Sequence, residues 1–305
     1  MNSDLLLSVV IPLRNEAPTL IRLHQQVVAT LQAMACHFEI IFVDDGSTDG
    51  SHEILAQIVK NHPHCCAVRF RRPYGKGAAY SVGFCEAKGD YVVTLDADLQ
   101  DDPTDIPRLI DRLEIGWDFV QGWRVTRQHP GVRKCLSWVY NVALRQASGV
   151  QLHDYNCGLK AMRSWVAKSL LLPGNTDNYL VLLASASGAR VSEVAVAHHP
   201  RAQGHSKYGP RGYLSAAIDF IPVCFITRYF DRPMYFFAGL AAIATLAACL
   251  APIKVSIAIG TGVLTVAVGM NSVFSLFPRG VEYARTLYSI ESVMRSTTID
   301  EGAHS

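Results

Sequence analysis

Two aspartates, at positions 96 and 98, form the strongest chemical signal in the sequence. They lie in Leu95-Asp-Ala-Asp-Leu-Gln100, directly after the apolar run 90–95, which has the composition of a buried strand. Carboxylates at positions i and i+2 that leave a strand for a turn can present oxygen atoms to a hard divalent cation, which keeps open positions for substrate phosphates. We therefore predict that Asp96 and Asp98 are ligands of such a cation. The following aspartates, at 101, 102 and 105, are expected mainly to cap a helix.

A second polar loop, Asp44-Asp-Gly-Ser47, follows the apolar run 38–43. A carboxylate at this place can accept hydrogen bonds from a base or a ribose, and the same residues also suit an Asx turn with a helix cap. Gly75-Lys76-Gly77 adds flexible backbone and one cation before a helical segment, which suits contact with a phosphate. The Walker spacing and a G-x-G-x-x-G after the first strand are both missing, so neither a P-loop nor a dinucleotide site is predicted.

Short apolar runs rich in β-branched residues alternate with helical segments through the first hundred residues. The expected strands are 7–12, 38–43, 67–70 and 90–95, and the expected helices are 19–34, 51–60 and 77–87. Strands that are apolar throughout indicate a parallel sheet with helices on both faces, and such sheets bind ligands at the carboxyl ends of their strands. Further along, strands are expected over 118–122 and 191–198, and helices over 132–147 and 178–187.

The composition excludes two classes of protein. Of the 305 residues, 50% are hydrophobic and 18% are charged, which is incompatible with a disordered chain at a net charge of +2. The 28 basic residues are nearly matched by 26 acidic ones, so binding of nucleic acid through bulk charge is not expected.

The hydrophobicity is concentrated in residues 234–278, where Lys254 is the only formally charged residue. The stretches 234–251 and 255–277 are long enough to cross a bilayer, which takes about 20 residues. Arginines flank the block, at 228 and 232 before it and at 279 and 285 after it, and this bias predicts two transmembrane helices with both termini in the cytoplasm. A buried hairpin of a soluble core is the alternative, but a soluble helix normally keeps a polar face. The small residues Gly260, Gly262 and Gly269 are compatible with a homo-oligomer.

These patterns divide the chain into four parts. We expect a cytoplasmic domain over 1–210, a juxtamembrane helix over 211–232, the transmembrane pair over 233–278 and a cytoplasmic tail over 279–305. The first residues lack the features of a secretory signal. The eight cysteines show no C-x-x-C spacing, and a disulfide framework is not expected in a reducing compartment. A zinc site in the segment His62-Pro-His-Cys-Cys66 is not expected, because the spacing of these residues does not match the usual ligand patterns.

Taken together, five motifs resemble the inverting nucleotide-sugar glycosyltransferases with a GT-A fold. Within that family the resemblance is to the branch of dolichyl-phosphate mannose synthase and the bacterial polyprenyl-phosphate glycosyltransferases. The motifs are Ser8-Val-Val-Ile-Pro-Leu-Arg-Asn-Glu16, Val43-Asp-Asp-Gly-Ser47, Leu95-Asp-Ala-Asp-Leu-Gln100, Asp154-Tyr-Asn-Cys-Gly-Leu-Lys-Ala-Met-Arg163 and Arg201-Ala-Gln-Gly-His-Ser-Lys207. The resemblance implies an α/β fold with a Rossmann-like, mostly parallel sheet and a C-terminal transmembrane hairpin.

The resemblance also implies roles for individual residues. Nucleotide binding is expected of Pro12, Arg14, Glu16, Val43, Asp45, Lys76 and Ala97, and binding of Mg²⁺ or Mn²⁺ of Asp96, Asp98 and Gln100. Catalytic roles fall to Asp98, Arg124, Arg201 and Lys207, and the acceptor phosphate is expected at Arg133, Ser137, Arg201 and Lys207. Two positions depart from the family pattern, which commonly has Tyr where Arg14 stands and Glu where His205 stands.

The expected reaction is transfer of a sugar from a nucleotide-sugar donor to a polyprenyl phosphate in the membrane, with inversion. A phosphate acceptor is already anionic at neutral pH, so no strong general base is required. Asp98 and Asp154 could orient it. Two alternatives stay open: transfer to a hydroxyl of a lipid or glycan, with Asp177 as base, and a noncatalytic membrane protein that binds nucleotide sugars. The Gln-x-x-Arg-Trp pattern of processive synthases is missing, so polymer synthesis is disfavoured.

Overall fold

The computed structural model describes residues 5–125, 142, 144–145, 149–170, 172, 176–200, 239, 242–243 and 288–296. The predicted juxtamembrane helix, and all but three residues of the predicted transmembrane pair, lie outside these ranges. Within the described ranges, every helix is too short or too polar to cross a membrane.

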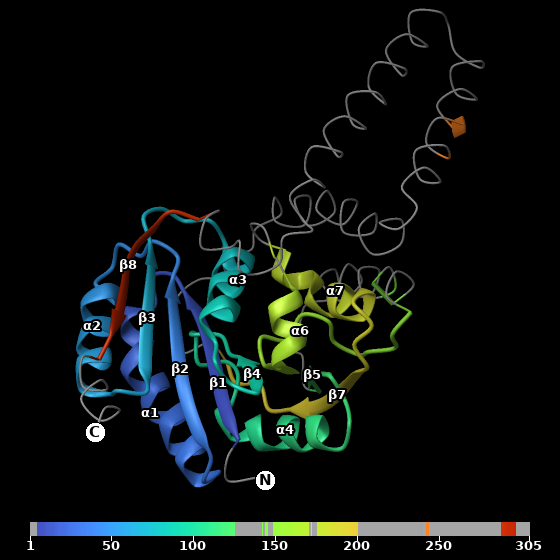
Figure 1. The fold of residues 1–305 in the computed structure, drawn as a ribbon, viewed down its shortest axis with the longest axis horizontal. Helices are drawn as coiled ribbons and strands as arrows, with labels where there is room; N and C mark the ends of the chain where they lie inside the picture. The colour runs from blue at the N-terminus through green and yellow to red at the C-terminus, as the bar shows by residue number, and fades with distance from the viewer. Residues whose placement is uncertain are drawn as a thin grey trace, which may run out of the picture. The chain divides into compact units, whose positions relative to one another are not determined.

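An eight-stranded sheet with the order β7-β5-β6-β4-β1-β2-β3-β8 forms the centre of the described chain (Figure 1). The strands are β1 (Leu6–Leu13), β2 (His37–Asp44), β3 (Cys65–Phe70), β4 (Tyr91–Thr94), β5 (Phe119–Arg124), β6 (Lys160–Arg163), β7 (Val191–Val196) and β8 (Ile290–Arg295). The helices are α1 (Ala17–Ala33), α2 (Ser51–Asn61), α3 (Lys76–Glu86), α4 (Ile106–Glu114), α6 (Ser164–Ser169) and α7 (Leu180–Ala186), with 3-10 turns η1 (Pro103–Asp105) and η2 (Thr176–Tyr179).

The sheet is mixed rather than uniformly parallel. Strands β1 to β4 run parallel to their neighbours among themselves, as the uninterrupted apolar runs predict, and β5 is parallel to β7. Strand β6 is antiparallel to both β4 and β5, and β8 is antiparallel to β3. The expected α/β class is therefore confirmed. Of the seven strand pairs in the described sheet, four are parallel and three are antiparallel, so the expected mostly parallel sheet is mixed.

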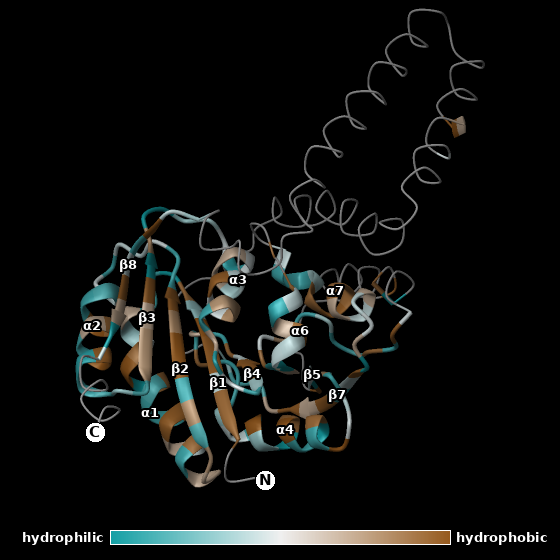
Figure 2. Cartoon of the chain, viewed as in Figure 1, coloured by the Kyte–Doolittle hydropathy of each residue, from teal (hydrophilic) through white to brown (hydrophobic). Residues whose placement is uncertain are grey.

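Helices cover both faces of the sheet, as expected. On one face, Leu20 and Leu23 of α1 share a buried apolar cluster with Val9 of β1 and Phe42 of β2, while α2 packs against β3 and α4 against β5 and β6. On the other face lie α3 and α6. Figure 2 shows the central strands as largely hydrophobic and the helices α1, α2 and α4 as having both hydrophobic and hydrophilic residues. This burial makes the sheet a rigid platform for the loops that leave its strands.

Strand β8 comes from the range 279–305, which the sequence indicated as a separate tail. It pairs with β3 and belongs to the same compact unit as residues 1–205. Arg295 Nη2 lies 2.6 Å from Oε2 of the buried Glu86 carboxylate on α3. This ion pair links β8 to α3. The tail range thus contributes the last strand of the sheet.

Candidate functional site

The loops that follow β1 and β2 lie side by side and are joined by hydrogen bonds. Pro12 and Val43 are partners in the parallel ladder. The backbone N–H of Asn15, a residue at φ 54°, donates to Ser47 Oγ at 2.9 Å, and Asn15 Oδ1 accepts from the Thr48 N–H at 2.8 Å. This pairing brings together five of the predicted nucleotide-binding residues, Pro12, Arg14, Glu16, Val43 and Asp45.

Asp45 connects these loops to the segment that carries Lys76. Its carboxylate accepts hydrogen bonds from the backbone N–H groups of Tyr74, at 2.6 Å, and Gly75, at 3.0 Å. Gly75 has φ 100° at the N-terminus of α3, a conformation that favours glycine. Burial raises the pKa of Asp45, and the two backbone donors and Arg14 only partly oppose this effect. Asp45 therefore holds the start of α3 against the loops after β1 and β2. We call these the nucleotide loops, after the role that the sequence predicts for them.

The turn after β4 holds Asp96, Ala97 and Asp98 in a defined conformation. Thr19 Oγ1, in the first turn of α1, donates to the carbonyl oxygen of Ala97 at 2.8 Å. The Gln100 N–H donates to Asp98 Oδ1 at 3.2 Å, across Leu99 at φ 61°. Because β4 pairs with β1, this turn lies next to the nucleotide loops, as the rule for parallel sheets predicts.

Lys76 lies between two carboxylates that are distant in sequence. Its Nζ is 2.6 Å from Asp96 Oδ1 and 3.8 Å from Asp177 Oδ2. Burial disfavours the charged form of Lys76, but Asp96, Tyr80 and Asp177 raise its pKa well above the ordinary value. Burial likewise opposes ionisation of Asp96, yet Lys76 lowers the pKa of that carboxyl overall. The Lys76–Asp96 pair is therefore ionised at neutral pH.

Asp177 and Lys160 extend this charged cluster into the protein. Burial raises the pKa of Asp177 despite Lys76 and Lys160, and Asp177 Oδ1 has no hydrogen-bond partner among the described residues. Burial and the charge of Lys76 lower the pKa of Lys160, whose Nζ donates to the carbonyl of Cys157. Fixed charges of both signs in a partly dry site are suited to stabilising charge that moves during a reaction.

Arg124, at the end of β5, forms a two-point ion pair with Asp154. The Nε–Oδ2 distance is 2.6 Å and the Nη2–Oδ1 distance is 3.1 Å, and both side chains are largely buried. Burial opposes the charge, but Asp154 raises the pKa of Arg124. Asp154 thus holds the guanidinium in one orientation, and its expected role in orienting the acceptor stays a prediction.

Gln100 and His198 place further possible metal donors beside the turn after β4. Gln100 Nε2 lies 3.5 Å from His198 Nε2, and His198 Nδ1 is buried without a hydrogen bond to any described residue. Carboxylate and amide oxygens together with an imidazole nitrogen are a donor set that suits Mn²⁺, and the oxygens alone suit Mg²⁺. Lys76 already neutralises Asp96 and would compete with a cation for that carboxylate.

Gly158 is a close contact of the Asp96 side chain. A Cβ atom at this position would lie 2.5 Å from Asp96 Cγ and 2.5 Å from Asp101 Oδ2. The motif 154–163 therefore touches the Asp-Ala-Asp turn through a residue that has no side chain.

We expect Gly158→Ala to lower the transferase activity expected from the sequence about 10-fold to 100-fold, because a displacement of about 1 Å at a reacting site can cost that much. Overpacking should also reduce the free energy of unfolding by about 1–3 kcal/mol. Steady-state kinetics and urea unfolding of the variant measure the two effects. A variant with the wild-type rate would show that the position of Asp96 is not critical.

Some of the predicted residues lie outside the described ranges, and some described residues were not predicted. Arg133, Ser137, Arg201 and Lys207 fall outside, so their predicted roles stay predictions. Lys160 and His198 were not singled out from the sequence. His198 could have been found, because it is the last residue of an expected strand, whereas no local pattern marks Lys160 as buried.

Comparison with known proteins assigns a family to the chain. Residues 8–171 match the family model "Glycosyl transferase family 2". An undecaprenyl-phosphate 4-deoxy-4-formamido-L-arabinose transferase of Pseudomonas aeruginosa is 38% identical over 217 residues, which cover 71% of this chain and 64% of that protein. The protein of the same name from Aeromonas hydrophila is 37% identical over 222 residues, covering 72% and 68%. The matched part thus spans about two thirds of the length of these relatives.

Solved structures share the fold at low sequence identity. Glucosyl-3-phosphoglycerate synthase from Mycobacterium tuberculosis in complex with UDP has a TM-score of 0.53 and 21% identity, covering 73% of this chain and 80% of that one. The same enzyme in complex with Mn²⁺ and UDP-glucose has a TM-score of 0.52 and 20% identity, covering 73% and 79%. At this identity the likeness supports the fold.

Proposed function

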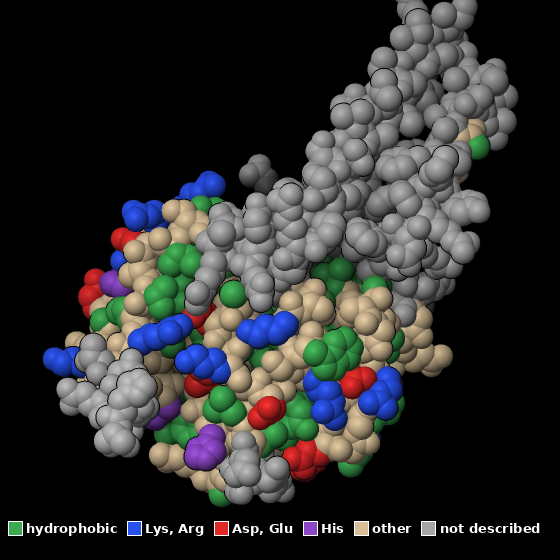
Figure 3. All heavy atoms as spheres, viewed as in Figure 1, with side chains coloured by type: hydrophobic (Ala, Val, Ile, Leu, Met, Phe, Trp, Pro, Cys, Tyr) green, Lys and Arg blue, Asp and Glu red, His purple; other side chains and the backbone are tan. Residues whose placement is uncertain are grey.

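The chain belongs to glycosyl transferase family 2, and on that premise we propose that it transfers a sugar from a nucleotide-sugar donor to a polyprenyl phosphate. One observation carries the proposal. The nucleotide loops after β1 and β2 lie next to the turn that holds Asp96 and Asp98, and Lys76 is bonded to Asp96 in that turn. The acceptor is inferred from the relatives, whose names specify undecaprenyl phosphate. Charges of both signs are interspersed on the face shown in Figure 3, which does not favour a nucleic-acid substrate.

In the proposed reaction, an acceptor phosphate oxygen attacks the anomeric carbon while the bond to the departing nucleoside diphosphate breaks, with inversion. Asp45 and its neighbours hold the nucleotide, and Lys76 places a positive charge next to the diphosphate. Arg124, aligned by Asp154, recognises a second anion through its planar guanidinium. Asp98 and Gln100, with Asp96 in the same turn and His198 beside Gln100, would hold a divalent cation, which would supply Lewis-acid neutralisation of the leaving group.

Transfer to a hydroxyl is the second candidate, and the buried Asp177 favours it to a limited extent. A carboxylate with a raised pKa could take a proton from a hydroxyl acceptor. A phosphate acceptor needs no such base, so Asp177 then serves to position Lys76.

The transfer assay uses full-length protein in detergent with radiolabelled nucleotide sugars and Mn²⁺. The acceptor is undecaprenyl phosphate in one arm and undecaprenol, which offers only a hydroxyl, in the other. We expect an acid-labile glycolipid with the phosphate alone. Product from undecaprenol would favour the second candidate, and no product with any donor would contradict sugar transfer to this lipid.

The sheet also bears on the proposed membrane topology. Strands β7 and β8 belong to one compact unit, and residues 206–279, which form the other unit, are joined to it at both ends of the chain segment. A segment whose two ends lie in one domain crosses a bilayer an even number of times. This argument supports the proposed pair of spans over 233–278, with both termini on the cytoplasmic side.

Reporter fusions test this topology. An enzyme reporter that is active only outside the cytoplasm should be inactive when fused after Ser305 and active when inserted next to Lys254. The opposite pattern would place the domain outside the cytoplasm, and activity at both positions would contradict the proposed pair of spans, because Lys254 would then lie on the same side as Ser305.

A further inference from the structure

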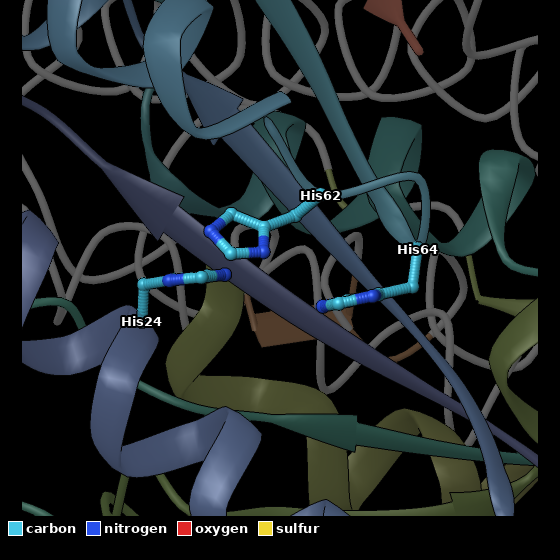
Figure 4. A group of neighbouring side chains, drawn as sticks. All are labelled: His24, His62 and His64. Carbon is cyan, nitrogen blue, oxygen red and sulfur yellow. The ribbon is translucent and has the colours of Figure 1, made fainter. Parts of the chain in front are cut away.

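Three histidines from three segments converge at a place remote from the candidate active site (Figure 4). His24 lies on α1, His62 follows the last residue of α2, and His64 precedes the first residue of β3. Their potential ligand nitrogens all lie within 4.8 Å of one another. Because His64 stands at the amino end of β3, the group is at the opposite end of the strand from the loops that hold Asp45 and Asp98.

The spacing of these atoms is close to that of a tetrahedral zinc site. Zinc–nitrogen bonds of about 2.1 Å place two nitrogen ligands about 3.4 Å apart, so small rotations of the rings bring the three nitrogens into range. Cys65 Sγ lies 3.5 Å from His24 Nε2, and a sulfur and a nitrogen ligand of tetrahedral zinc are about 3.6 Å apart. Its contact with His24 makes Cys65 a candidate for the fourth ligand.

One nitrogen of the group lacks a hydrogen-bond partner among the described residues. The Nε2 atom of His64 is buried and has no hydrogen-bond partner among the described residues. A stack of core rings alone would leave that nitrogen unsatisfied, whereas a metal ion would bond it.

A hydrated ion has a path to the group. A hollow of about 410 Å³ between α1 and α2 is lined by His24 and His62 together with the polar side chains of Gln25, Gln57 and Asn61. The site therefore lies at the base of an accessible depression rather than in a sealed core.

We propose that His24, His62 and His64 bind a divalent transition metal of the zinc type, with Cys65 as the fourth ligand, separate from the active-site cation. The metal ties α1 to the turn between α2 and β3. Residues 62–66 alone have unsuitable spacing, and the fold supplies the missing ligand from His24, 38 positions before His62. Burial raises the pKa of the Cys65 thiol to about 12, so zinc must displace its proton on binding. This proposal does not depend on the proposed transfer reaction.

Metal content of the full-length protein, purified in detergent with a tag that contains no histidine, tests the proposal. After chelation and re-addition of Zn²⁺ followed by desalting, we expect about one retained equivalent of zinc per chain. His62→Gln and His64→Gln should each lose it, while the exposed His37→Gln and the active-site variant Asp98→Asn should keep it. Retention of zinc by both His62→Gln and His64→Gln, or no retained zinc in the wild type, would overturn the site.

Two further measurements are made first on the wild-type protein, so they do not fail if a variant does not fold. Co²⁺ added to the wild-type protein should give the absorption of tetrahedral cobalt, with a thiolate charge-transfer band that Cys65→Ser removes. The absence of tetrahedral absorption would contradict the site, and the absence of the thiolate band would overturn Cys65 as the fourth ligand. Zn²⁺ should raise the unfolding temperature of the chelated wild type and not that of His62→Gln, and equal shifts in both would count against binding by His62.

Discussion

Replacing Asp98 with asparagine is expected to reduce sugar transfer by more than about 100-fold while leaving the fold intact. Loss of a residue that only supports a metal ligand commonly costs 10-fold to 100-fold, so loss of a ligand itself should cost at least the upper value. Asparagine keeps the shape of Asp98 and can still accept the Gln100 N–H, which lies 3.2 Å from Asp98 Oδ1. The expected defect is therefore one of charge, and it should be measured as kcat/KM over a titration of Mn²⁺.

Asp111→Asn is the matched control, because Asp111 is an exposed carboxylate on α4 away from the turn after β4. It should retain the wild-type rate and metal dependence. If Asp98→Asn kept the wild-type rate at limiting Mn²⁺, the assignment of Asp98 as a metal ligand would be wrong. Unfolding curves of both variants show whether a loss of activity reflects a loss of structure.

The parts of the site that follow parallel strands were predictable from sequence because their pattern is local. The apolar runs ending at Val43 and Leu95 predict buried strands, and the polar residues after them must meet at one edge of the sheet. The structure confirms this arrangement for the loops of Asp45 and Asp98. The family resemblance, which rested on the same segments, is confirmed by the family match over residues 8–171.

The antiparallel strands were not predictable in the same way. Strand β6 is Lys-Ala-Met-Arg, and Lys160 within it is buried only because the fold provides the Cys157 carbonyl as its partner. Strand β8 is Ile-Glu-Ser-Val-Met-Arg, an alternating edge strand that lies about 220 residues after its partner β3. Neither pattern distinguishes a strand from a polar segment, because the stabilising contacts are distant in sequence.

Long-range ion pairs were also invisible in the sequence. Lys76 was expected to contact a phosphate, and its contacts with Asp96 and Asp177 depend on the meeting of α3, the turn after β4 and η2. Arg124 was expected among phosphate-binding residues, and its pairing with Asp154 appears only when β5 and the segment before β6 come together. In both cases the residue type predicted a positive charge, while the fold determined which carboxylates orient the side chain.

Lys76→Met should abolish most of the transfer activity and also lower the free energy of unfolding by about 2 kcal/mol at pH 7. Removing one partner of a fully buried ion pair costs about 3–5 kcal/mol, and the smaller value allows for the exposure of about a third of the Lys76 and Asp96 side chains. Methionine preserves the length of the side chain, so the effect reports the lost charge. Activity should fall by more than about 100-fold, because Asp96 and Asp177 then repel the incoming diphosphate.

The loss of stability should depend on pH in a defined direction. Lys76 lowers the folded-state pKa of Asp96, so the pair contributes stability above the unfolded-state pKa of 3.8 and loses it as the pH falls through the folded-state pKa. In Lys76→Met the carboxyls of Asp96 and Asp177 are unpaired at pH 7 and become neutral as the pH falls. The difference in unfolding free energy between wild type and variant should therefore narrow from pH 7 to about pH 4, as measured by urea unfolding.

Two further variants separate the charge of Lys76 from its packing. Lys88→Met removes an exposed lysine after α3 and should change neither activity nor stability appreciably. Adding Asp177→Asn to Lys76→Met removes one of the two unpaired carboxylates, so it should restore part of the stability and none of the activity. A stability difference that stayed constant with pH would attribute the effect of Lys76→Met to packing rather than to the ion pair, because only the latter is linked to protonation of Asp96 and Asp177.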